Sequence, residues 1–277
     1  MNIEEIKKFS KEVGSRFYFD HDLKKSNWFN IGGKTKVYFK PDTLADLVSF
    51  LKKFGNKEKI YILGAGSNTL ISDNLYDGIV IKLGKNFSNI SLLPNNIIVA
   101  GSSCLDAKLS EFAQDNEIGG LEFLACIPGT VGGGLKMNAG CFGKEFKDIL
   151  VSIQAIDRIG NVITLPANKV LFEYRNNNLP NDLIFLSASV KGEKKDKDAI
   201  KKKILELKKK KDSTQPTKIK TSGSTFKNPI NQTNKKVWEL IKESVPLNTT
   251  FGDACISDKH CNFFVNKNNA SFKDMIK

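Results

Sequence analysis

The feature of this sequence that most restricts its fold is a glycine-dense segment at residues 127–143, which reads IPGTVGGGLKMNAGCFG. Glycines at this density, together with one proline, favour a rigid, irregular loop over a regular helix or strand. Such a loop presents many backbone N–H donors, and these must find partners. A pyrophosphate or the edge of a flavin ring would supply the acceptors. The segment therefore indicates a dinucleotide cradle, and the simpler alternative is an ordinary glycine-rich connector.

A second, shorter glycine motif, GAGSN at residues 64–68, comes directly after a predicted strand at 59–63. Its glycines allow the backbone to approach a phosphate closely, and Ser67 and Asn68 can add side-chain hydrogen bonds. Alone, the motif is equally compatible with a plain tight turn, because glycine clusters usually mark turns. Two such loops in one chain, one of them ending a strand, favour a dinucleotide cradle.

Hydrophobic periodicity and turn residues predict a mixture of helices and strands. The predicted helices cover residues 2–14, 43–54, 105–116, 194–211 and 238–244. The predicted strands cover residues 36–39, 59–63, 78–83, 90–100 with a turn at 94–96, a hairpin at 151–165, and 261–266. Because no regular βαβ alternation appears, the pattern favours an α+β fold over a doubly wound sheet.

The lysine-rich helix at 194–211 marks the expected domain boundary, because Ile200, Ile204 and Leu207 lie on one side and lysines occupy the rest. A length of 277 residues suits two domains, which we place at residues 1–211 and 212–277. No apolar run reaches the roughly 18–20 residues that a membrane span needs. Residues 1–10 also lack the apolar core of a signal peptide. We therefore expect a cytoplasmic protein without a membrane partner.

Charge and cysteine content argue against two further classes of protein. The net charge is +13, but only three of the 43 basic residues are arginines, namely Arg16, Arg158 and Arg175. Nucleic-acid readers usually combine arginines with interleaved aromatic residues, so we expect no nucleic-acid partner. The lysine excess fits solvated faces and the steering of anionic substrates. Five cysteines without a CxxC pair argue against a disulfide framework and against a structural metal site.

Three motifs together resemble one known family. The sequences GAGSN at 64–68, IPGTVGG to MNAG at 127–140 and NWFNIGG at 27–33 are similar to the FAD-binding half of the UDP-N-acetylenolpyruvoylglucosamine reductase family. The resemblance extends from about residue 27 to about residue 272. It implies the two-subdomain FAD-binding fold of the vanillyl-alcohol-oxidase (PCMH) type, with a core at about 27–193, plus a C-terminal α+β substrate-binding domain. Cys126 and Gly134 replace residues that are more often glycine and alanine in the family.

The resemblance also implies which residues bind FAD. They come from the two glycine motifs and from the MNAG sequence that follows: Gly64, Ala65, Gly66, Ser67, Asn68, Pro128, Gly129, Thr130, Gly132, Gly133, Asn138, Ala139 and Gly140.

Two further motifs carry the catalytic residues that the resemblance implies. In FEYRN at 172–176, Arg175 would stabilise negative charge on C2 and its carboxylate when reduced flavin delivers hydride to C3 of an enol ether. In TSGSTFKNP at 221–229, Ser224 would donate the proton to C2, where positioning matters more than the acidity of the hydroxyl. The implied substrate contacts are Tyr174, Lys227 and Asn228. Without the resemblance, an exposed arginine and an ordinary loop serine would be the simpler interpretations.

The last matching motif, at residues 252–266, contains His260, for which we expect a structural hydrogen bond rather than a proton-transfer role. The family has a further catalytic glutamate, which has no counterpart before the last residue, Lys277; Asp274 lies too early. We therefore expect a substrate-binding domain that is truncated at its C-terminus, with FAD binding retained and catalysis impaired.

The implied reaction is the NADPH-dependent reduction of UDP-N-acetylglucosamine enolpyruvate to UDP-N-acetylmuramate through bound FAD. This step belongs to peptidoglycan synthesis, and hence to cell wall biogenesis, cell shape and cell division. We expect a monomer whose partner is a nucleotide-sugar substrate. Three alternatives stay open: a truncated flavin-binding protein with impaired catalysis, another oxidoreductase of the same FAD fold, and a basic nucleic-acid-binding protein without flavin.

Overall fold

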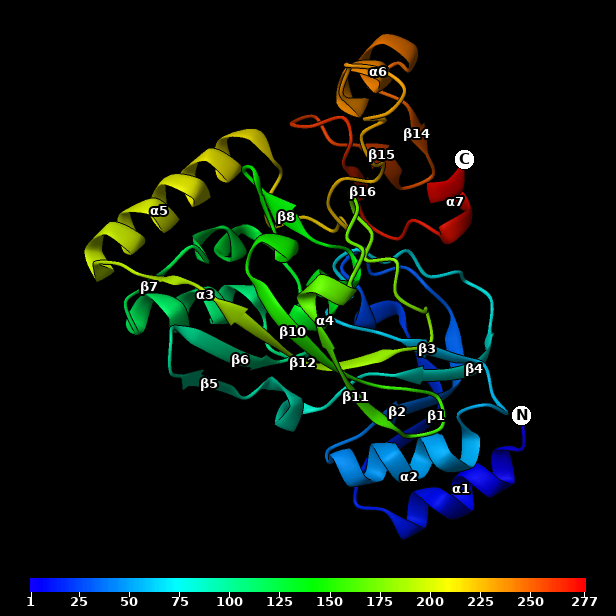
Figure 1. Ribbon diagram of the computed structural model, residues 1–277. Helices are drawn as coiled ribbons and strands as arrows, with labels where there is room; N and C mark the ends of the chain where they lie inside the picture. The colour runs from blue at the N-terminus through cyan, green and yellow to red at the C-terminus, as the bar shows by residue number, and fades with distance from the viewer. The chain divides into compact units, whose positions relative to one another are not determined.

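The chain folds into two compact units in the computed structural model, which describes residues 1–277 (Figure 1). Unit 1 comprises Met1–Phe19, Val37–Ala65 and Asp77–Lys208, and unit 2 comprises Asp20–Lys36, Gly66–Tyr76 and Lys209–Lys277. Each unit is therefore built from three separate segments of the sequence.

The first layer of unit 1 is a four-stranded sheet in the order β1-β2-β4-β3, whose strands lie mainly in this unit. The strands are β1 (Arg16–Asp22), β2 (Lys34–Lys40), β3 (Ile60–Ile62) and β4 (Tyr76–Ile81), with β3 parallel to β4. Helices α1 (Ile3–Glu12) and α2 (Leu44–Phe54) pack against this sheet (Figure 1). Apolar residues recur every three or four positions on both helices, so Phe9, Phe50 and Phe54 meet in an aromatic core.

Helix α2 begins and ends where the sequence predicts. The Thr43 hydroxyl accepts a hydrogen bond from the backbone N–H of Asp46 at 3.1 Å and so caps the helix. Gly55 follows the last residue, and a Cβ atom at this position would lie 1.8 Å from the carbonyl oxygen of Arg158. Only glycine permits this approach of two backbone segments, so the glycine that ends the helix also lets the β10–β11 turn pack against it.

The second layer of unit 1 is a five-stranded antiparallel sheet in the order β11-β10-β12-β6-β5. Its strands are β5 (Ile90–Leu93), β6 (Ile97–Gly101), β10 (Leu150–Ile156), β11 (Val162–Pro166) and β12 (Ile184–Lys191). Helices α3 (Asp106–Asp115) and α4 (Val131–Lys136) pack on one face, where Ala100, Leu109, Leu135 and Ala188 share a buried core. The central strand β12 contributes to this core from one face, and it contributes Ile184 and Leu186 to the core of the first layer.

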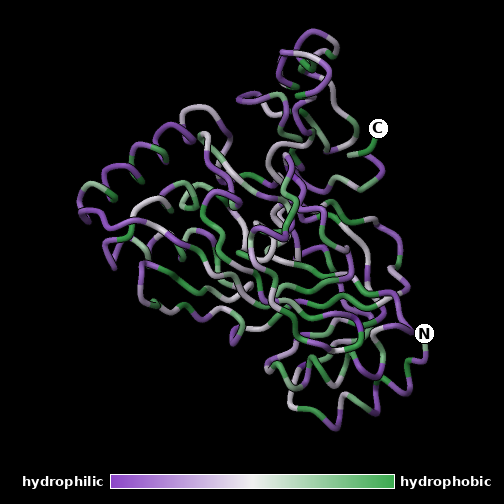
Figure 2. The backbone as a smooth tube through the Cα atoms, in the orientation of Figure 1, coloured by the Kyte–Doolittle hydropathy of each residue, from purple (hydrophilic) through white to green (hydrophobic).

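Smaller elements complete unit 1. The pairs β7 (Ile118–Gly119) with β13 (Glu193–Lys194) and β8 (Gly140–Cys141) with β9 (Lys144–Glu145) are two-stranded, and the short helices are η2 (Lys85–Ser88), η3 (Glu122–Cys126), η4 (Phe146–Asp148) and η5 (Ala167–Lys169). Helix α5 (Lys197–Thr214) buries Ile200, Ile204 and Leu207, while its lysines stay in solvent. In the backbone tube of Figure 2, α5 is mostly coloured hydrophilic, with hydrophobic residues at intervals.

Unit 2 contains a three-stranded sheet in the order β14-β15-β16, formed by Thr250–Phe251, Ala254–Ile256 and Phe264–Asn266. Its helices are η1 (Lys24–Ser26), α6 (Val237–Ser244) and α7 (Phe272–Ile276), and Ser271 caps α7. The core gathers Phe29, Ile31, Ala254, Ala270 and Met275. Residues near position 30 thus pack with residues near position 270, and the Asn266 side chain secures this by donating to the carbonyl oxygen of Phe29 at 2.7 Å.

The mixed sheets and helices confirm the predicted α+β class. The longest strands that were not predicted are β1 and the central β12, because charged and serine residues interrupt their apolar patterns; the unpredicted β7, β8, β9, β13, β14 and β15 have only two or three residues each. The segment 127–143 is also not the fully irregular loop that we predicted, since α4 occupies its middle. None of the helices combines the length and the apolar character that crossing a bilayer requires.

Candidate functional site

The first glycine motif, residues 64–68, leaves β3 without continuing into a helix. The backbone N–H groups of all five residues lack a hydrogen-bond partner within the chain. Gly66 has a φ of +70°, and a Cβ atom there would lie 2.3 Å from the carbonyl oxygen of Ser26. A glycine is therefore required at this turn, which leaves consecutive N–H donors available to an anionic group.

The second glycine motif forms the N-terminus of α4. Thr130 caps this helix, and its hydroxyl accepts a long hydrogen bond of 3.4 Å from the N–H of Gly133. The N–H groups of Val131 and Gly132 donate to the carbonyl oxygens of Cys104 and Ser102, both at 2.9 Å. Several donors that we predicted to be unpaired are thus satisfied within the chain, because the segment before α3 supplies carbonyl acceptors to the first turn of α4.

Two backbone donors of this second motif have no intramolecular partner, namely the N–H groups of Gly129 and Thr130. They lie close to the start of the first motif within unit 1, since a Cβ atom at Gly64 would lie 3.0 Å from Thr130 Oγ1. The two motifs therefore meet and present the N–H groups of Gly64, Ala65, Gly129 and Thr130 from one region. This donor-rich surface, on which only Ala65 and Thr130 carry side chains, fits the diphosphate of a dinucleotide cofactor.

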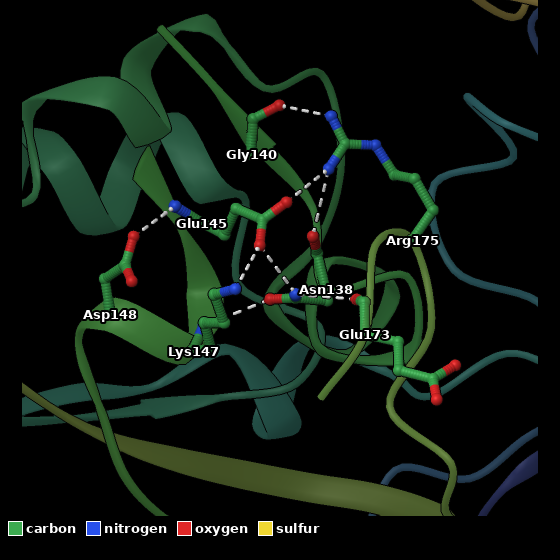
Figure 3. Close-up of polar contacts among 7 residues, drawn as sticks. All are labelled: Asn138, Gly140, Glu145, Lys147, Asp148, Glu173 and Arg175. Carbon is green, nitrogen blue, oxygen red and sulfur yellow. Dashed lines mark hydrogen bonds and ion pairs between the residues drawn. The ribbon is translucent and has the colours of Figure 1, made fainter. Parts of the chain in front are cut away.

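The MNAG segment turns at Asn138, which has a φ of +39° and a fully buried side chain. Its Nδ2 donates to Glu145 Oε2 at 2.9 Å and to the carbonyl oxygen of Glu173 at 3.0 Å, while its Oδ1 accepts from the N–H of Lys147 at 3.1 Å. Figure 3 shows these contacts converging on one side chain. Asn138 therefore holds the MNAG turn to two other segments of unit 1.

Arg175 lies in a tight turn of the chain at residues 173–176, with a φ of +58°. Its Nη1 donates to the carbonyl oxygen of Asn138 at 3.2 Å and to Glu145 Oε1 at 3.1 Å, and its Nη2 donates to the carbonyl oxygen of Gly140 at 2.9 Å (Figure 3). The guanidinium carbon also lies 4.8 Å from the centre of the Tyr174 ring. These contacts orient a half-buried guanidinium, so Arg175 is not the loosely held surface residue of the simpler interpretation.

Two buried ionisable side chains, Cys104 and Asp106, lie at or just before the start of α3. Burial raises the pKa of Asp106 well above its usual range, and neither carboxylate oxygen has a hydrogen-bond partner. Burial and the neighbouring Asp106 raise the pKa of Cys104 to about 11. Cys104 is therefore a protonated thiol at neutral pH and is unsuited to act as a nucleophile.

Ser224 belongs to unit 2, where it lines a cavity of about 320 Å³. Asn262 holds the loop that carries Ser224, because its backbone and side chain together form three hydrogen bonds with Thr225 and Phe226. Apolar and polar residues share the cavity wall: Phe29, Asn68, Leu70, Ser222, Ser224, Thr225, Phe264 and Met275. A hydroxyl group is thus presented, in an exposed position, to a space that can admit part of a small molecule.

Three other predicted residues have defined surroundings in unit 2. Asn228 Oδ1 accepts from the N–H of Val237 at 3.0 Å, so one of its functional groups caps α6. Lys227 is exposed to solvent. His260 Nδ1 accepts from the N–H of Asn262 at 3.2 Å, which is a structural hydrogen bond of the kind that we expected, and burial lowers the pKa of His260.

The predicted site residues divide between the two units. Unit 1 carries Gly64, Ala65, Pro128, Gly129, Thr130, Gly132, Gly133, Asn138, Ala139, Gly140, Tyr174 and Arg175, and unit 2 carries Gly66, Ser67, Asn68, Ser224, Lys227 and Asn228. Within each unit the structure brings together residues that are far apart in sequence, such as Asn138 with Arg175 and Asn68 with Ser224.

Two residues with clear positions in these networks were missed by sequence analysis, Glu145 and Asn262. Glu145 stands between Lys144 and Lys147 and resembles an exposed, charged turn. Asn262 lies within a motif that we recognised, but nothing in its immediate sequence indicates that it binds the backbone at Phe226. The roles of Glu145 and Asn262 depend on contacts between distant segments, which hydrophobic periodicity does not reveal.

Models of two protein families match the chain. A model described as FAD binding domain matches residues 35–166, and a model described as UDP-N-acetylenolpyruvoylglucosamine reductase, C-terminal domain, matches residues 215–277. The UDP-N-acetylenolpyruvoylglucosamine reductase of Pelagibacter ubique is 75% identical over 277 residues, covering 100% of this chain and 92% of that protein. The protein of the same name from Rickettsia typhi is 48% identical over 256 residues, covering 92% of this chain and 85% of that protein.

Solved structures agree with these sequence relationships. UDP-N-acetylenolpyruvylglucosamine reductase from Thermus caldophilus superposes with a TM-score of 0.81 at 29% identity, covering 95% of this chain and 91% of that chain. The glucose dehydrogenase Phl p 4.0202 superposes with a TM-score of 0.53 at 12% identity, covering 68% of this chain and 43% of that chain, which shows a shared fold alone. Together with the FAD binding domain match, these structures confirm the predicted two-part fold class.

Proposed function

The chain belongs to the UDP-N-acetylenolpyruvoylglucosamine reductase family, and from this premise we propose that it reduces UDP-N-acetylglucosamine enolpyruvate to UDP-N-acetylmuramate with FAD and NADPH. The observation that carries the cofactor assignment is the contact between Gly64 and Thr130, which joins two glycine motifs into one surface of backbone donors. When bound to these backbone donors, FAD would supply the hydride-transfer chemistry that links NADPH to C3 of the enolpyruvyl group.

The chain's own residues hold the cofactor through backbone groups. The N–H groups of Gly64, Ala65, Gly129 and Thr130 would donate to diphosphate oxygens, which are otherwise hydrated in solution. The family resemblance extends this set to the other predicted FAD-binding residues of the two glycine motifs and the MNAG turn. The absence of side chains at the glycines permits the close approach that such short contacts require.

Arg175 stabilises the charge that develops on the substrate. Hydride arrival at C3 leaves negative charge on C2 and its carboxylate, and a guanidinium fixed in advance lowers the energy of that state. Its anchors on Asn138, Gly140 and Glu145 meet the requirement for prior orientation, because little reorganisation is needed during reaction.

Ser224 donates the proton that completes the product at C2. Protonation of a carbanion-like centre is downhill, so a weakly acidic hydroxyl suffices when it is correctly placed. The cavity that Ser224 lines can admit the enolpyruvyl end of the substrate. Tyr174, Lys227 and Asn228 would contact the rest of the nucleotide sugar, with Lys227 supplying positive charge for its diphosphate.

The product is a precursor of peptidoglycan, so we place the protein in cell wall biogenesis, and thereby in cell shape and cell division. We assign FAD binding to residues 1–211 and substrate binding mainly to residues 212–277. We further propose that the protein acts as a monomer in the cytoplasm, where its nucleotide-sugar substrate is made.

The visible absorption spectrum of the purified protein tests this proposal. We expect a flavin spectrum that bleaches with NADPH in the absence of oxygen and recovers when the enolpyruvyl substrate is added. Bleaching without recovery would leave the flavin assignment intact and contradict the proposed reduction of the enolpyruvyl substrate by this chain. Failure to bind FAD on titration would overturn the proposal as a whole.

A further inference from the structure

The carboxylate of Glu145 is a charged partner of the Arg175 guanidinium. Glu145 Oε1 lies 3.1 Å from Arg175 Nη1, and only 19% of the Glu145 side chain is exposed. The two residues are 30 positions apart in sequence, so the pair depends on the fold rather than on local structure. Partial burial makes such a pair stronger and more directional than an exposed ion pair.

The second oxygen of Glu145 is also occupied. Glu145 Oε2 accepts from Asn138 Nδ2 at 2.9 Å and lies 3.2 Å from Lys147 Nζ, and the carboxylate accepts a further hydrogen bond from the N–H of Asp148 in a capping box. In return, Asp148 accepts from the N–H of Glu145 at 2.9 Å (Figure 3). Four donors therefore surround one carboxylate, close to the number that its two oxygens can accept.

This arrangement joins Arg175 to the MNAG turn. Arg175 donates directly to the carbonyl oxygens of Asn138 and Gly140, and Glu145 binds both Arg175 and the Asn138 side chain. A side chain that touches the arginine and its anchor at once restricts the guanidinium in two directions. Lys147 Nζ lies close to Glu145 Oε2, the oxygen that does not pair with Arg175.

We propose that Glu145 is the positioning residue of Arg175: it holds the guanidinium in the orientation in which it meets the substrate's developing negative charge. This inference rests on the proposed function of Arg175. Two cations, Arg175 and Lys147, contact the Glu145 carboxylate, while the Asp148 carboxylate is held by the backbone N–H of Glu145. The positive charge of Lys147 offsets part of the negative charge that Glu145 brings to the guanidinium, so Glu145 can fix the arginine without fully cancelling its attraction for an anionic substrate.

The Glu145→Gln substitution tests the role of the charge at nearly constant shape. A glutamine amide retains one acceptor but turns an N–H₂ group toward donors that already face this position. We expect normal flavin content and bleaching by NADPH within about twofold of wild type, but reoxidation by the enolpyruvyl substrate slowed about 10- to 100-fold, as small misplacements of catalytic groups produce. In Glu145→Asp, which keeps the charge, the rate of reoxidation by substrate should lie between the rates of wild type and Glu145→Gln.

Anaerobic stopped-flow absorbance separates the two half-reactions, and the flavin spectral change on substrate binding gives a second readout. The matched control is Glu122→Gln, because Glu122 is a buried glutamate of the same unit that pairs with Lys195 at 3.3 Å. We expect this control to change stability but not the rate of reoxidation by substrate. If each variant, Glu145→Gln and Glu145→Asp, slowed reduction by NADPH as much as reoxidation by substrate at matched flavin content, Glu145 would have a merely structural role. That result would overturn the inference.

Comparison with Arg175→Ala separates failure of the inference from failure of the proposed function. If Arg175→Ala reoxidises at the wild-type rate, the proposed role of Arg175 is wrong. If Arg175→Ala is slow but Glu145→Gln is normal, only the positioning role is wrong. If Glu145 acts through Arg175, adding Glu145→Gln to Arg175→Ala should change the rate by less than about twofold, whereas full multiplicative slowing contradicts the inference.

Discussion

The side chain of Asn262 binds both backbone polar groups of Phe226. Asn262 Oδ1 accepts from the N–H of Phe226 and Nδ2 donates to its carbonyl oxygen, both at 3.0 Å. The Asn262 carbonyl oxygen also accepts from the N–H of Thr225 at 2.8 Å. Asn262 itself is buried and its side-chain bonds to Phe226 are part-buried, so these bonds hold the loop that follows Ser224.

The Asn262→Ala variant should therefore lose both stability and turnover. Two side-chain hydrogen bonds to part-buried backbone groups of Phe226 disappear, each contributing about 0.5–1.5 kcal/mol to stability. Urea unfolding should detect this loss, and the substrate half-reaction should slow while flavin content stays unchanged. The control is Asn268→Ala, since the exposed Asn268 side chain donates only one long hydrogen bond of 3.4 Å to Asp253. Equal turnover in the two variants would contradict the role given to Asn262.

Replacement of Ser224 by alanine should slow product formation without affecting reduction by NADPH. The hydroxyl is the proposed proton donor, and a well-placed acid contributes about 10²- to 10⁴-fold to such a step. Rapid-mixing absorbance under anaerobic conditions measures both half-reactions in one preparation. A variant that forms product at the wild-type rate would show that the proton comes from elsewhere.

The Gly64→Ala variant should bind FAD more weakly than wild type. The added Cβ atom would lie 3.0 Å from Thr130 Oγ1, which is tighter than most real Cβ contacts, so Thr130 must shift by a few tenths of an ångström beside two of the proposed diphosphate donors. We expect an increase in the FAD dissociation constant of about tenfold or more, equivalent to about 1.4 kcal/mol. Quenching of flavin fluorescence on titration of the apoprotein measures this constant. Gly14→Ala is the control, because no atom lies within 4 Å of a Cβ at that position, and it should bind FAD normally.

Asp106 should make the stability of the protein fall as pH rises from acid to neutral. Burial raises the pKa of Asp106 in the folded state above its usual range near 3.8, so above this pH the unfolded chain releases a proton that the folded chain retains. Asp106→Asn removes this dependence. The stability of the variant relative to wild type should therefore increase between pH 4 and pH 7, by up to about 1.4 kcal/mol for each pH unit over which the folded chain retains the proton.

Urea unfolding at several pH values, at matched flavin content, measures this difference. If the difference in unfolding free energy between wild type and Asp106→Asn were the same at pH 4 and pH 7, Asp106 would not have the raised pKa. No other change in charge accompanies the substitution, so the pH dependence of this difference reports Asp106 directly.

Much of the fold could be predicted from the sequence because the relevant signals are local. The apolar spacing in α2, its Thr43 cap and the Gly55 that ends it are contained within about twelve consecutive residues. The same holds for the strand that precedes the first glycine motif. Strand β12 was missed because it is buried in the centre of a sheet while serines interrupt its sequence, and only its two neighbouring strands stabilise it there.

In the candidate site, too, some features follow from the sequence and others only from the tertiary structure. By itself, the sequence determined the residue types that bind phosphate, carry a fixed charge and donate a proton, because glycine, arginine and serine have these properties wherever they lie. Only the tertiary structure decided that Gly64 meets Thr130 and that Glu145 and Asn138 surround Arg175. The physical reason is that hydrogen bonds and close packing act over about 3 Å in space, whereas the residues that form them are 30 or more positions apart along the chain.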